Sequence, residues 1–349
     1  MFKKLLLLCS LFFVLCFTNQ ASGYDYDITL PDVPLSMSGV ESDIHLKVFV
    51  NEGIDYGTKT VFVIPGWTHT AETWAPFAEE VFQVSNDYGC FYNTKYVVAI
   101  DLPGHGKSTI SPESAFSMLS FNDYTIAVIS AIERLKADIG MNIKTIIGHS
   151  QGGLILQLVQ QKLKTEGGLR KLGIRKAVLL APVVPRELKW NFLDQFDPLA
   201  FAGNFLVQDN GFFLLPEQVW IPFFFTNSQT GIIAGGAPTA EDVALKGYNT
   251  PEPLYSSLEL VGYNMSLLPD NNMRPSVRPG IFSLFSLVDM QMICYTQDTL
   301  VSQDECPELF SYLRKPYGIG HLTIVNETDA VHDMHSSNPG VVAKQIREG

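Results

Sequence analysis

A single serine stands between two glycines in the sequence Gly148-His149-Ser150-Gln151-Gly152. The pentapeptide ends a short apolar run, 144–149, that predicts a strand, and it opens a stretch, 151–163, whose leucines have helical spacing. Gly-x-Ser-x-Gly in this setting is typical of a nucleophile elbow, a sharp turn that projects the serine hydroxyl. The glycines are needed because larger side chains would keep the strand and the helix apart. We therefore predict that Ser150 is a nucleophile; the alternative is a glycine-flanked turn with an inert serine.

A serine hydroxyl is a weak nucleophile at neutral pH and requires a base and a carboxylate that orients the base. His332 follows the last predicted strand, 321–325, and is our candidate for the base, against the alternative of a surface loop histidine. Three other histidines compete. His335 lies deeper in the same segment, His321 begins the strand instead of following it, and His149 is too close to the serine to bond its hydroxyl well.

The candidate for the carboxylate is Asp298, three residues beyond Tyr295 at the end of the predicted strand 290–295. Asp304 and Glu305 are its rivals. The alternative reading of Asp298 is a residue that caps a turn or a helix.

Acyl transfer also requires two backbone N–H groups that bind the developing oxyanion. We predict that Gln151, at the elbow, supplies one of them and that Trp67 supplies the other, since Gly66 lets the backbone turn there. The alternative is an ordinary glycine turn with a packing tryptophan. His69 either lines this site or is solvated in its loop. This chemistry needs no metal or organic cofactor, and no cysteine spacing resembles a zinc site.

The elements that must position these residues alternate along the chain. Apolar residues with helical spacing lie between several of the apolar runs that predict strands. Strands that alternate with helices predict an α/β fold with a mostly parallel sheet covered on both faces. The apolar runs that predict strands are 45–50, 60–66, 96–104, 144–149, 176–182, 290–295 and 321–325.

The alternation stops between about 184 and 284, in a stretch rich in Phe, Pro and Gly. We interpret it as an insertion over the sheet. Its aromatic residues either line an apolar substrate pocket or pack the core of the insertion itself. The pocket candidates are Phe212, Phe213, Trp220 and Phe224.

Residues 1–23 resemble a secretory signal peptide: Lys3 and Lys4 precede an apolar run that is shorter than the roughly 20 residues of a membrane span. The alternative is an uncleaved anchor. The formal net charge is −12, and because residues 1–23 hold two lysines and no acid, the mature chain would carry −14. So acidic a chain disfavours nucleic-acid binding.

Three cysteines remain beyond the predicted signal: Cys90, Cys294 and Cys306. In an exported protein, this odd number allows at most one internal disulfide. Cys294 and Cys306 are the closer pair, but spacing alone does not show that they meet. Cys90 is otherwise interpreted as a small buried hydrophobic residue.

Taken together, the motifs PGW, DLPGHGKS, GHSQGG, TQDTLVS and VHDMHSSNP, spread over about 43–346, resemble the α/β-hydrolase superfamily. The resemblance implies an eight-stranded, mostly parallel sheet with helices on both faces, a cap inserted after the sixth strand, and a triad in the order Ser, Asp, His. The expected division is a signal peptide (1–23), a first core part (24–183), a cap (184–284) and a second core part (285–349).

The resemblance also separates branches of the superfamily. DLPGHGKS is a structural loop in the family, so His105 is left out of the site. A serine at the elbow argues against the dehalogenase and epoxide-hydrolase branches, which have an aspartate there. Two positions depart from the family: Pro65 stands where His is frequent, and Tyr295 stands where Gly is usual.

The expected function is that of a secreted or periplasmic serine esterase or lipase. It would cleave a small-molecule or lipid-like apolar ester through an acyl-enzyme intermediate and, for a lipid-like substrate, make transient contact with a membrane or lipid surface. An amidase, a thioesterase, a lactonase, a carbon–carbon bond hydrolase or a cofactor-free haloperoxidase would share the triad. A catalytically silent binding module is the alternative from another class.

Overall fold

The computed structural model describes residues 25–36, 39–54, 59–66, 69–85, 91–111, 121–182, 288–298, 306–307, 310, 320–327, 330 and 332–348. The predicted signal peptide and the predicted cap lie outside these residues. Within the described ranges, no helix combines the length and the hydropathy that crossing a bilayer requires.

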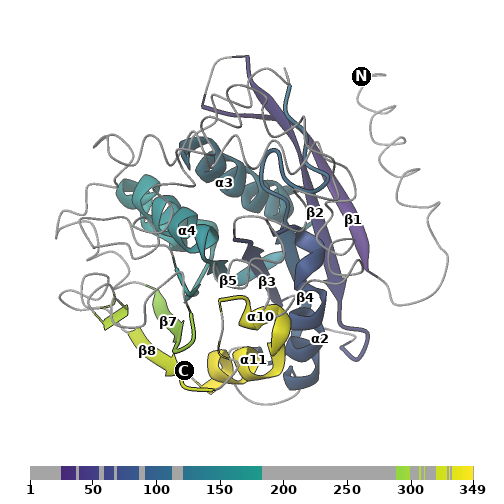
Figure 1. The fold of residues 1–349 in the computed structure, drawn as a ribbon. Coiled ribbons are helices and arrows are strands. Elements are labelled where there is room, and N and C mark those ends of the chain that lie inside the picture. Colours follow the sequence, from purple (N-terminus) through teal and green to yellow (C-terminus); the bar gives the residue numbers. More distant parts are fainter. Residues whose placement is uncertain are drawn as a thin grey trace, which may run out of the picture.

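One eight-stranded sheet organises the described chain, as the family resemblance implies (Figure 1). The strand order is β1-β2-β4-β3-β5-β6-β7-β8. β1 and β2 pair antiparallel, as do β2 and β4, and all later pairs are parallel. The strands are β1 (Tyr26–Pro34), β2 (Glu41–Val50), β3 (Lys59–Ile64), β4 (Thr94–Ile100), β5 (Asn142–His149), β6 (Lys176–Leu180), β7 (Asp289–Tyr295) and β8 (Gly320–Val325).

The central strands are buried on both faces. In β3, Phe62 and Ile64 face one apolar core, whereas Val61 and Val63 face the other. A continuous apolar run, instead of an alternating one, is the sequence pattern of such a two-sided parallel strand. This is why the runs from 60 onward predict the central strands well.

Helices cover both faces of the sheet (Figure 1). The first core includes buried residues of α3 and α4, and the second includes buried residues of α2, α10 and α11. The helical elements are η1 (Ala71–Trp74), α2 (Ala75–Val84), α3 (Phe121–Asp138), α4 (Gln151–Lys162), η3 (Lys164–Glu166), η4 (Gly168–Leu172), α10 (Met334–Ser337) and α11 (Pro339–Glu348).

The sequence analysis did not identify β1. This edge strand contains two prolines and two aspartates, and most of its side chains are exposed. Its register is also interrupted between Leu30 and Val33. An edge strand tolerates proline because one side of its backbone forms no ladder hydrogen bonds, and its apolar pattern is correspondingly weak.

A disulfide joins Cys294, in β7, to Cys306. The sequence left this pairing open, and the structure resolves it. Asp298 lies between the two cysteines, which are 12 positions apart, so the bridge closes a short loop around the candidate carboxylate. Cys90 lies outside the described residues.

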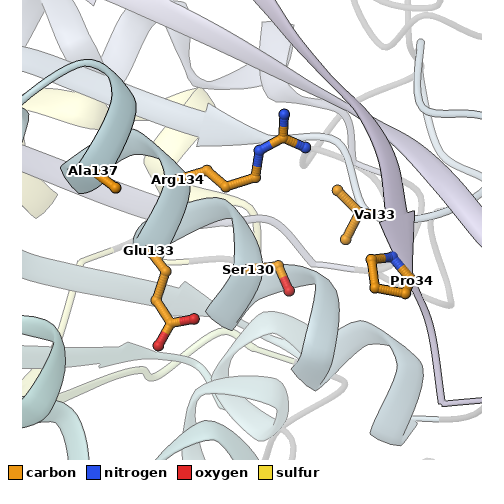
Figure 2. A pocket seen from close by; sticks show the side chains of 6 residues that line it. All are labelled: Val33, Pro34, Ser130, Glu133, Arg134 and Ala137. Atoms are coloured by element: carbon orange, nitrogen blue, oxygen red, sulfur yellow. The ribbon is translucent and has the colours of Figure 1, made fainter. Parts of the chain in front are cut away.

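A shallow pocket of about 260 Å³ lies between β1 and α3 (Figure 2). Its lining combines apolar side chains with Glu133 and Arg134, and Arg134 is already engaged with the Pro31 carbonyl and the Asp138 carboxylate. None of its lining residues comes from the strand ends that carry the predicted catalytic residues. We assign it no function.

Candidate active site

Ser150 lies on a strained turn between β5 and α4. Its φ is +51° and its ψ is −117°, a left-handed φ that residues other than glycine rarely adopt. A Cβ on Gly148 would lie 2.5 Å from the Gly152 carbonyl oxygen, and a Cβ on Gly152 would lie 2.2 Å from the Ile64 carbonyl oxygen. The two glycines therefore permit close passage of β5, α4 and the end of β3, as the elbow interpretation predicts.

The candidate base and acid meet at the same edge of the sheet. Asp298 follows β7 and His332 follows β8, and because these strands are parallel their carboxyl ends are neighbours. His332 Nδ1 and Asp298 Oδ2 lie 2.8 Å apart, and both side chains are buried. A carboxylate only accepts, so Nδ1 carries the proton and Nε2 is left to accept another.

The surroundings of His332 favour the protonated form of its imidazole. Burial disfavours the charged imidazolium, but the Asp298 carboxylate, with a contribution from Asp333, outweighs it and raises the pKa of His332 above 6.5. The same attraction would stabilise an imidazolium formed during catalysis.

His335 and His321, which compete with His332 for the role of base in the sequence analysis, lie in different environments. His335 stacks on Trp74, with ring centroids 4.1 Å apart, and is fully buried. His321 is exposed near the start of β8. The carboxylate rivals Asp304 and Glu305 lie outside the described residues.

Of the two predicted oxyanion donors, one lies among the described residues and the other does not. Gln151 is the first residue of α4, so its N–H has no acceptor within the helix. Gly66 lies against the elbow, because a Cβ there would come within 3.0 Å of the Ser150 Cβ. Trp67, the next residue, lies outside the described residues. So do the pocket candidates, which are Phe212, Phe213, Trp220 and Phe224.

Tyr295, which stands where the family usually has glycine, is the last residue of β7 and is fully buried in the second core. Burial, with the nearby Asp298 and Asp333 charges, raises the pKa of its hydroxyl. The larger residue is thus accommodated as a packed and neutral side chain.

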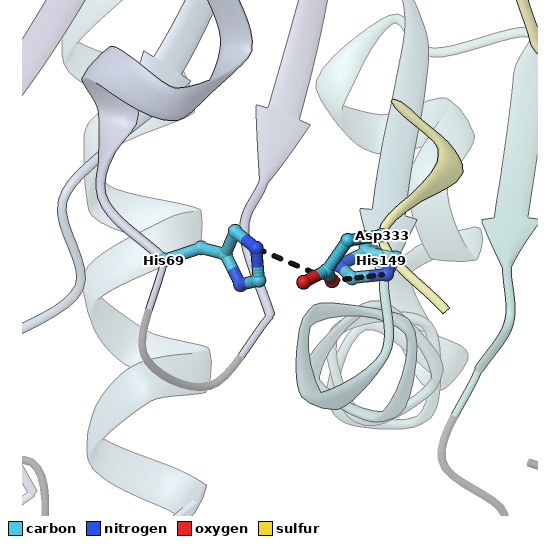
Figure 3. Close-up of side chains that lie close together, drawn as sticks. All are labelled: His69, His149 and Asp333. Atoms are coloured by element: carbon cyan, nitrogen blue, oxygen red, sulfur yellow. Dashed lines mark ion pairs between the residues drawn. The ribbon is translucent and has the colours of Figure 1, made fainter. Parts of the chain in front are cut away.

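Three buried side chains form a cluster that the sequence analysis did not foresee. His69 Nε2 lies 3.3 Å and His149 Nε2 lies 3.8 Å from Asp333 Oδ1 (Figure 3). These residues have types that bind metal ions, and their ligand atoms lie within 4.8 Å of one another. However, His149 Nε2 lies 2.9 Å from the His332 carbonyl oxygen. A carbonyl oxygen only accepts, so this nitrogen is protonated and cannot bind a metal while the bond persists.

A sequence signal for this cluster existed. An aspartate directly follows the candidate base, a histidine directly precedes the candidate nucleophile, and a third titratable residue follows Gly66 by three positions. Each of them is next to a segment that the elbow interpretation brings to one edge of the sheet.

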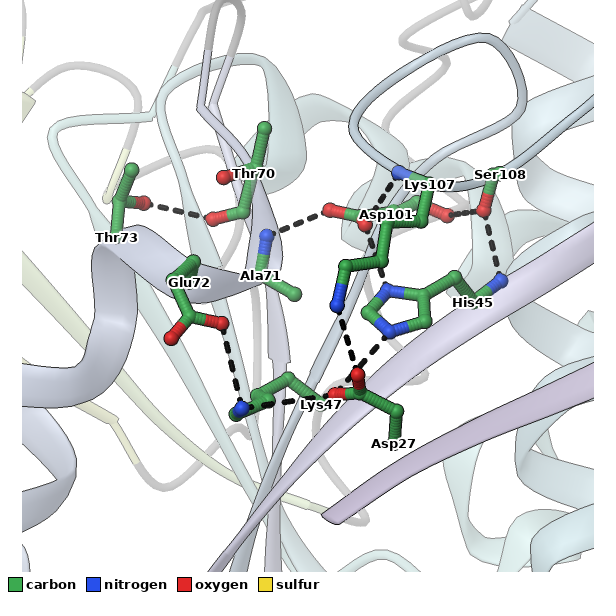
Figure 4. Close-up of polar contacts among 10 residues, drawn as sticks. All are labelled: Asp27, His45, Lys47, Thr70, Ala71, Glu72, Thr73, Asp101, Lys107 and Ser108. Carbon is green, nitrogen blue, oxygen red and sulfur yellow. Dashed lines mark hydrogen bonds and ion pairs between the residues drawn. The ribbon is translucent and has the colours of Figure 1, made fainter. Parts of the chain in front are cut away.

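The DLPGHGKS motif begins with a buried carboxylate that anchors the segment after β3. Asp101 accepts hydrogen bonds from the backbone N–H groups of Ala71, at 2.6 Å, and Lys107, at 2.9 Å. It also pairs with His45 Nδ1 at 2.7 Å (Figure 4). Ala71 opens η1, just after the loop that carries the predicted oxyanion donor. The motif is therefore structural, as the family resemblance implies.

The comparisons with known proteins agree with this architecture. An esterase from Exiguobacterium antarcticum has a TM-score of 0.56 at 14% identity, with 88% of this chain and 94% of that chain covered. A bacterial membrane phospholipase A has a TM-score of 0.57 at 16% identity, with 99% and 95% covered. Haloalkane dehalogenase from Bradyrhizobium elkani USDA94 has a TM-score of 0.61 at 13% identity, with 92% and 97% covered.

At these identities, structural likeness shows the fold alone. No curated protein matches the chain in sequence. A family model described as the alpha/beta hydrolase family matches residues 61–345, most of the chain. The chain therefore belongs to the alpha/beta hydrolase family.

Proposed function

We propose that this protein is an exported serine hydrolase that cleaves apolar carboxylic esters through an acyl-enzyme intermediate. Ser150 is the nucleophile, His332 the general base and Asp298 the carboxylate that orients it. The observation that carries the proposal is the combination of a serine at φ +51° on a glycine-flanked elbow with a buried His–Asp pair, 2.8 Å apart, at the same sheet edge.

In the first half-reaction, Ser150 Oγ attacks the acyl carbonyl while His332 Nε2 accepts its proton. Asp298 keeps the other imidazole nitrogen protonated and stabilises the imidazolium. The N–H of Gln151, together with that of Trp67, binds the oxyanion, and each such donor is worth about 2.7–4 kcal/mol. His332 then gives the proton to the leaving alcohol.

In the second half-reaction, water attacks the acyl group on Ser150. His332 accepts a proton from this water and returns it to Ser150 Oγ, which releases the carboxylic acid. The serine, the base and the oxyanion donors act in both steps, so the cycle is complete without a further co-reactant.

An ester substrate is favoured because solved structures of the same fold include an esterase and a phospholipase A. The aromatic residues Phe212, Phe213, Trp220 and Phe224 would bind an apolar acyl chain. Export through the signal at 1–23 is supported by its sequence pattern and is tested by the N-terminal mass of the protein recovered from the host's exported fraction.

Two measurements test the catalytic proposal. The mature protein and Ser150→Ala are compared for reaction with a fluorophosphonate, which labels activated serines, and for hydrolysis of p-nitrophenyl esters from acetate to palmitate. We expect labelling and hydrolysis by the wild type only, and the preferred chain length separates an esterase from a lipase.

The outcomes distinguish the alternatives. Labelling without ester hydrolysis would indicate a triad hydrolase with another substrate class. Labelling that persists in Ser150→Ala would show that the nucleophile is wrong. No labelling of a folded wild type would favour a catalytically silent binding module.

A further inference from the structure

His69, His149 and Asp333, which we name the buried clasp, come from three segments far apart in the chain. Asp333 is fully buried and its carboxylate lies between the two imidazoles, as Figure 3 shows. The Asp333 Oδ1 distances are 3.3 Å to His69 Nε2 and 3.8 Å to His149 Nε2. A buried carboxylate is costly unless polar groups surround it, and the two imidazoles are part of the polar surroundings of Asp333.

Each member of the buried clasp is adjacent to one part of the candidate machinery. His149 directly precedes Ser150, Asp333 directly follows His332, and His69 lies three residues beyond Gly66, with its N–H on the Gly66 carbonyl at 3.2 Å. The cluster therefore connects the elbow, the base loop and the loop that carries the predicted oxyanion donor.

The strongest connection is the hydrogen bond from His149 Nε2–H to the main-chain oxygen of His332, at 2.9 Å. It joins residues 183 positions apart and is buried. Burial, followed by the nearby His332, holds the pKa of His149 well below 6.5, so its ring stays neutral with the proton on Nε2. The other nitrogen, Nδ1, faces Gly66, where a Cβ would approach it to 2.7 Å.

We propose that His149 and Asp333 are positioning residues that hold the base loop against the nucleophile elbow, so that the His332 imidazole is kept in reach of Ser150. The inference rests on the proposed function and adds two residues that do not touch the substrate. A displacement of reacting groups by about 1 Å costs roughly 100-fold in rate, so a loose base loop would have a measurable effect.

The first test removes the donor from His149. His149→Leu replaces the imidazole with an apolar side chain of similar size, whereas His149→Gln retains an N–H donor at the end of the side chain. We expect kcat on a p-nitrophenyl ester to fall about 100-fold in His149→Leu with little change in KM, and to recover at least partly in His149→Gln. The matched control is His105→Leu, another fully buried histidine whose ring packs on Tyr124; it should change stability but not kcat.

The second test uses Asp333→Asn and the pH profile of kcat/KM. The titratable groups that face His332 are Asp298 after β7, His149 at the end of β5 and Asp333. Three further groups surround these neighbours: His69 near Asp333, His335 against His149, and Tyr295 near Asp298 and Asp333. Asp333 contributes to the raised pKa of His332, so its neutral isostere should move the acidic limb of the profile to lower pH. A purely structural defect would lower the amount of active protein without moving this limb.

The results separate this inference from the proposed function. If the wild type reacts with the fluorophosphonate but His149→Leu has wild-type kcat, or if the acidic limb of Asp333→Asn does not move, the positioning role is wrong and the serine hydrolase stands. If EDTA abolishes wild-type activity and Zn²⁺ restores it, a cation bound by the buried clasp, and not the His149–His332 hydrogen bond, positions the base loop, and the inference is wrong. If a folded wild type does not react at all, the proposed function fails, and the positioning role fails with it.

Discussion

Gly152→Ala is the most direct test of the elbow geometry. Gly152 is the second residue of α4 and passes against the end of β3. An added Cβ would lie 2.2 Å from the Ile64 carbonyl oxygen and 2.5 Å from the Pro65 carbonyl oxygen. Both contacts are with backbone atoms, so no side chain can rotate away to relieve them.

The size of the effect follows from these distances. Real Cβ atoms essentially never approach a neighbour closer than 3.0 Å. The start of α4 or the end of β3 must therefore move by at least 0.8 Å, the difference between 3.0 Å and 2.2 Å. Ser150 precedes the helix by one residue and the oxyanion loop follows β3 directly. A shift of about 1 Å between them costs roughly 100-fold in rate, and the overpacking destabilises the fold by about 1–3 kcal/mol.

The assay is the rate of fluorophosphonate labelling, normalised to folded protein, together with the free energy of unfolding from urea titration. Gly53→Ala is the control, since its added Cβ would meet only the Asn51 side-chain oxygen, at 3.3 Å, and no backbone atom within 4 Å. We expect slow labelling in Gly152→Ala and wild-type labelling in Gly53→Ala. Wild-type labelling by Gly152→Ala would refute the reasoning, because the close passage would then not position the nucleophile.

Three further outcomes are expected. Asp298→Asn should lower kcat by about 10⁴-fold, as loss of a triad carboxylate does; a small loss would move the role to Asp304 or Glu305. kcat/KM should fall on the acid side with an apparent pKa above 6.5, because His332 must be neutral to accept a proton and its pKa is raised; a limb centred below 6.5 would contradict this. Reduction of the Cys294–Cys306 disulfide should lower the unfolding free energy by about 3 kcal/mol, measured as a lower Tm with reductant; an unchanged Tm would show that the bridge does not constrain the unfolded chain.

The sequence predicted the fold through its central strands. β3 to β7 are buried along most of their length, so their apolar runs predict strands clearly. β8 is more exposed, but its run at 321–325 still predicts a strand. The edge strand β1 was missed because its exposed residues, prolines and irregular register leave little apolar pattern. The family model at 61–345 confirms the resemblance on which the eight-stranded expectation rested.

For the candidate site, sequence reasoning identified the serine through a local signal, the spacing of glycines at a strand-to-helix transition. It ranked Asp298 and His332 by their place after predicted strands, and the structure brings them to 2.8 Å. It did not identify Asp333 or the role of His149, because the motifs GHSQGG and VHDMHSSNP that contain these residues do not specify which distant side chains they meet.

By itself, the sequence determined the features that depend on neighbours along the chain: the elbow at Ser150, the strand-and-helix alternation and the acidic charge. Only the tertiary structure decided which distant groups meet. The Cys294–Cys306 pair, the Asp333 contacts and the His149 bond to His332, across 183 positions, depend on the order and register of the strands. The physical reason is that a hydrogen bond or an ion pair depends on the position of both partners to within an ångström or less, and only the packed sheet determines both positions.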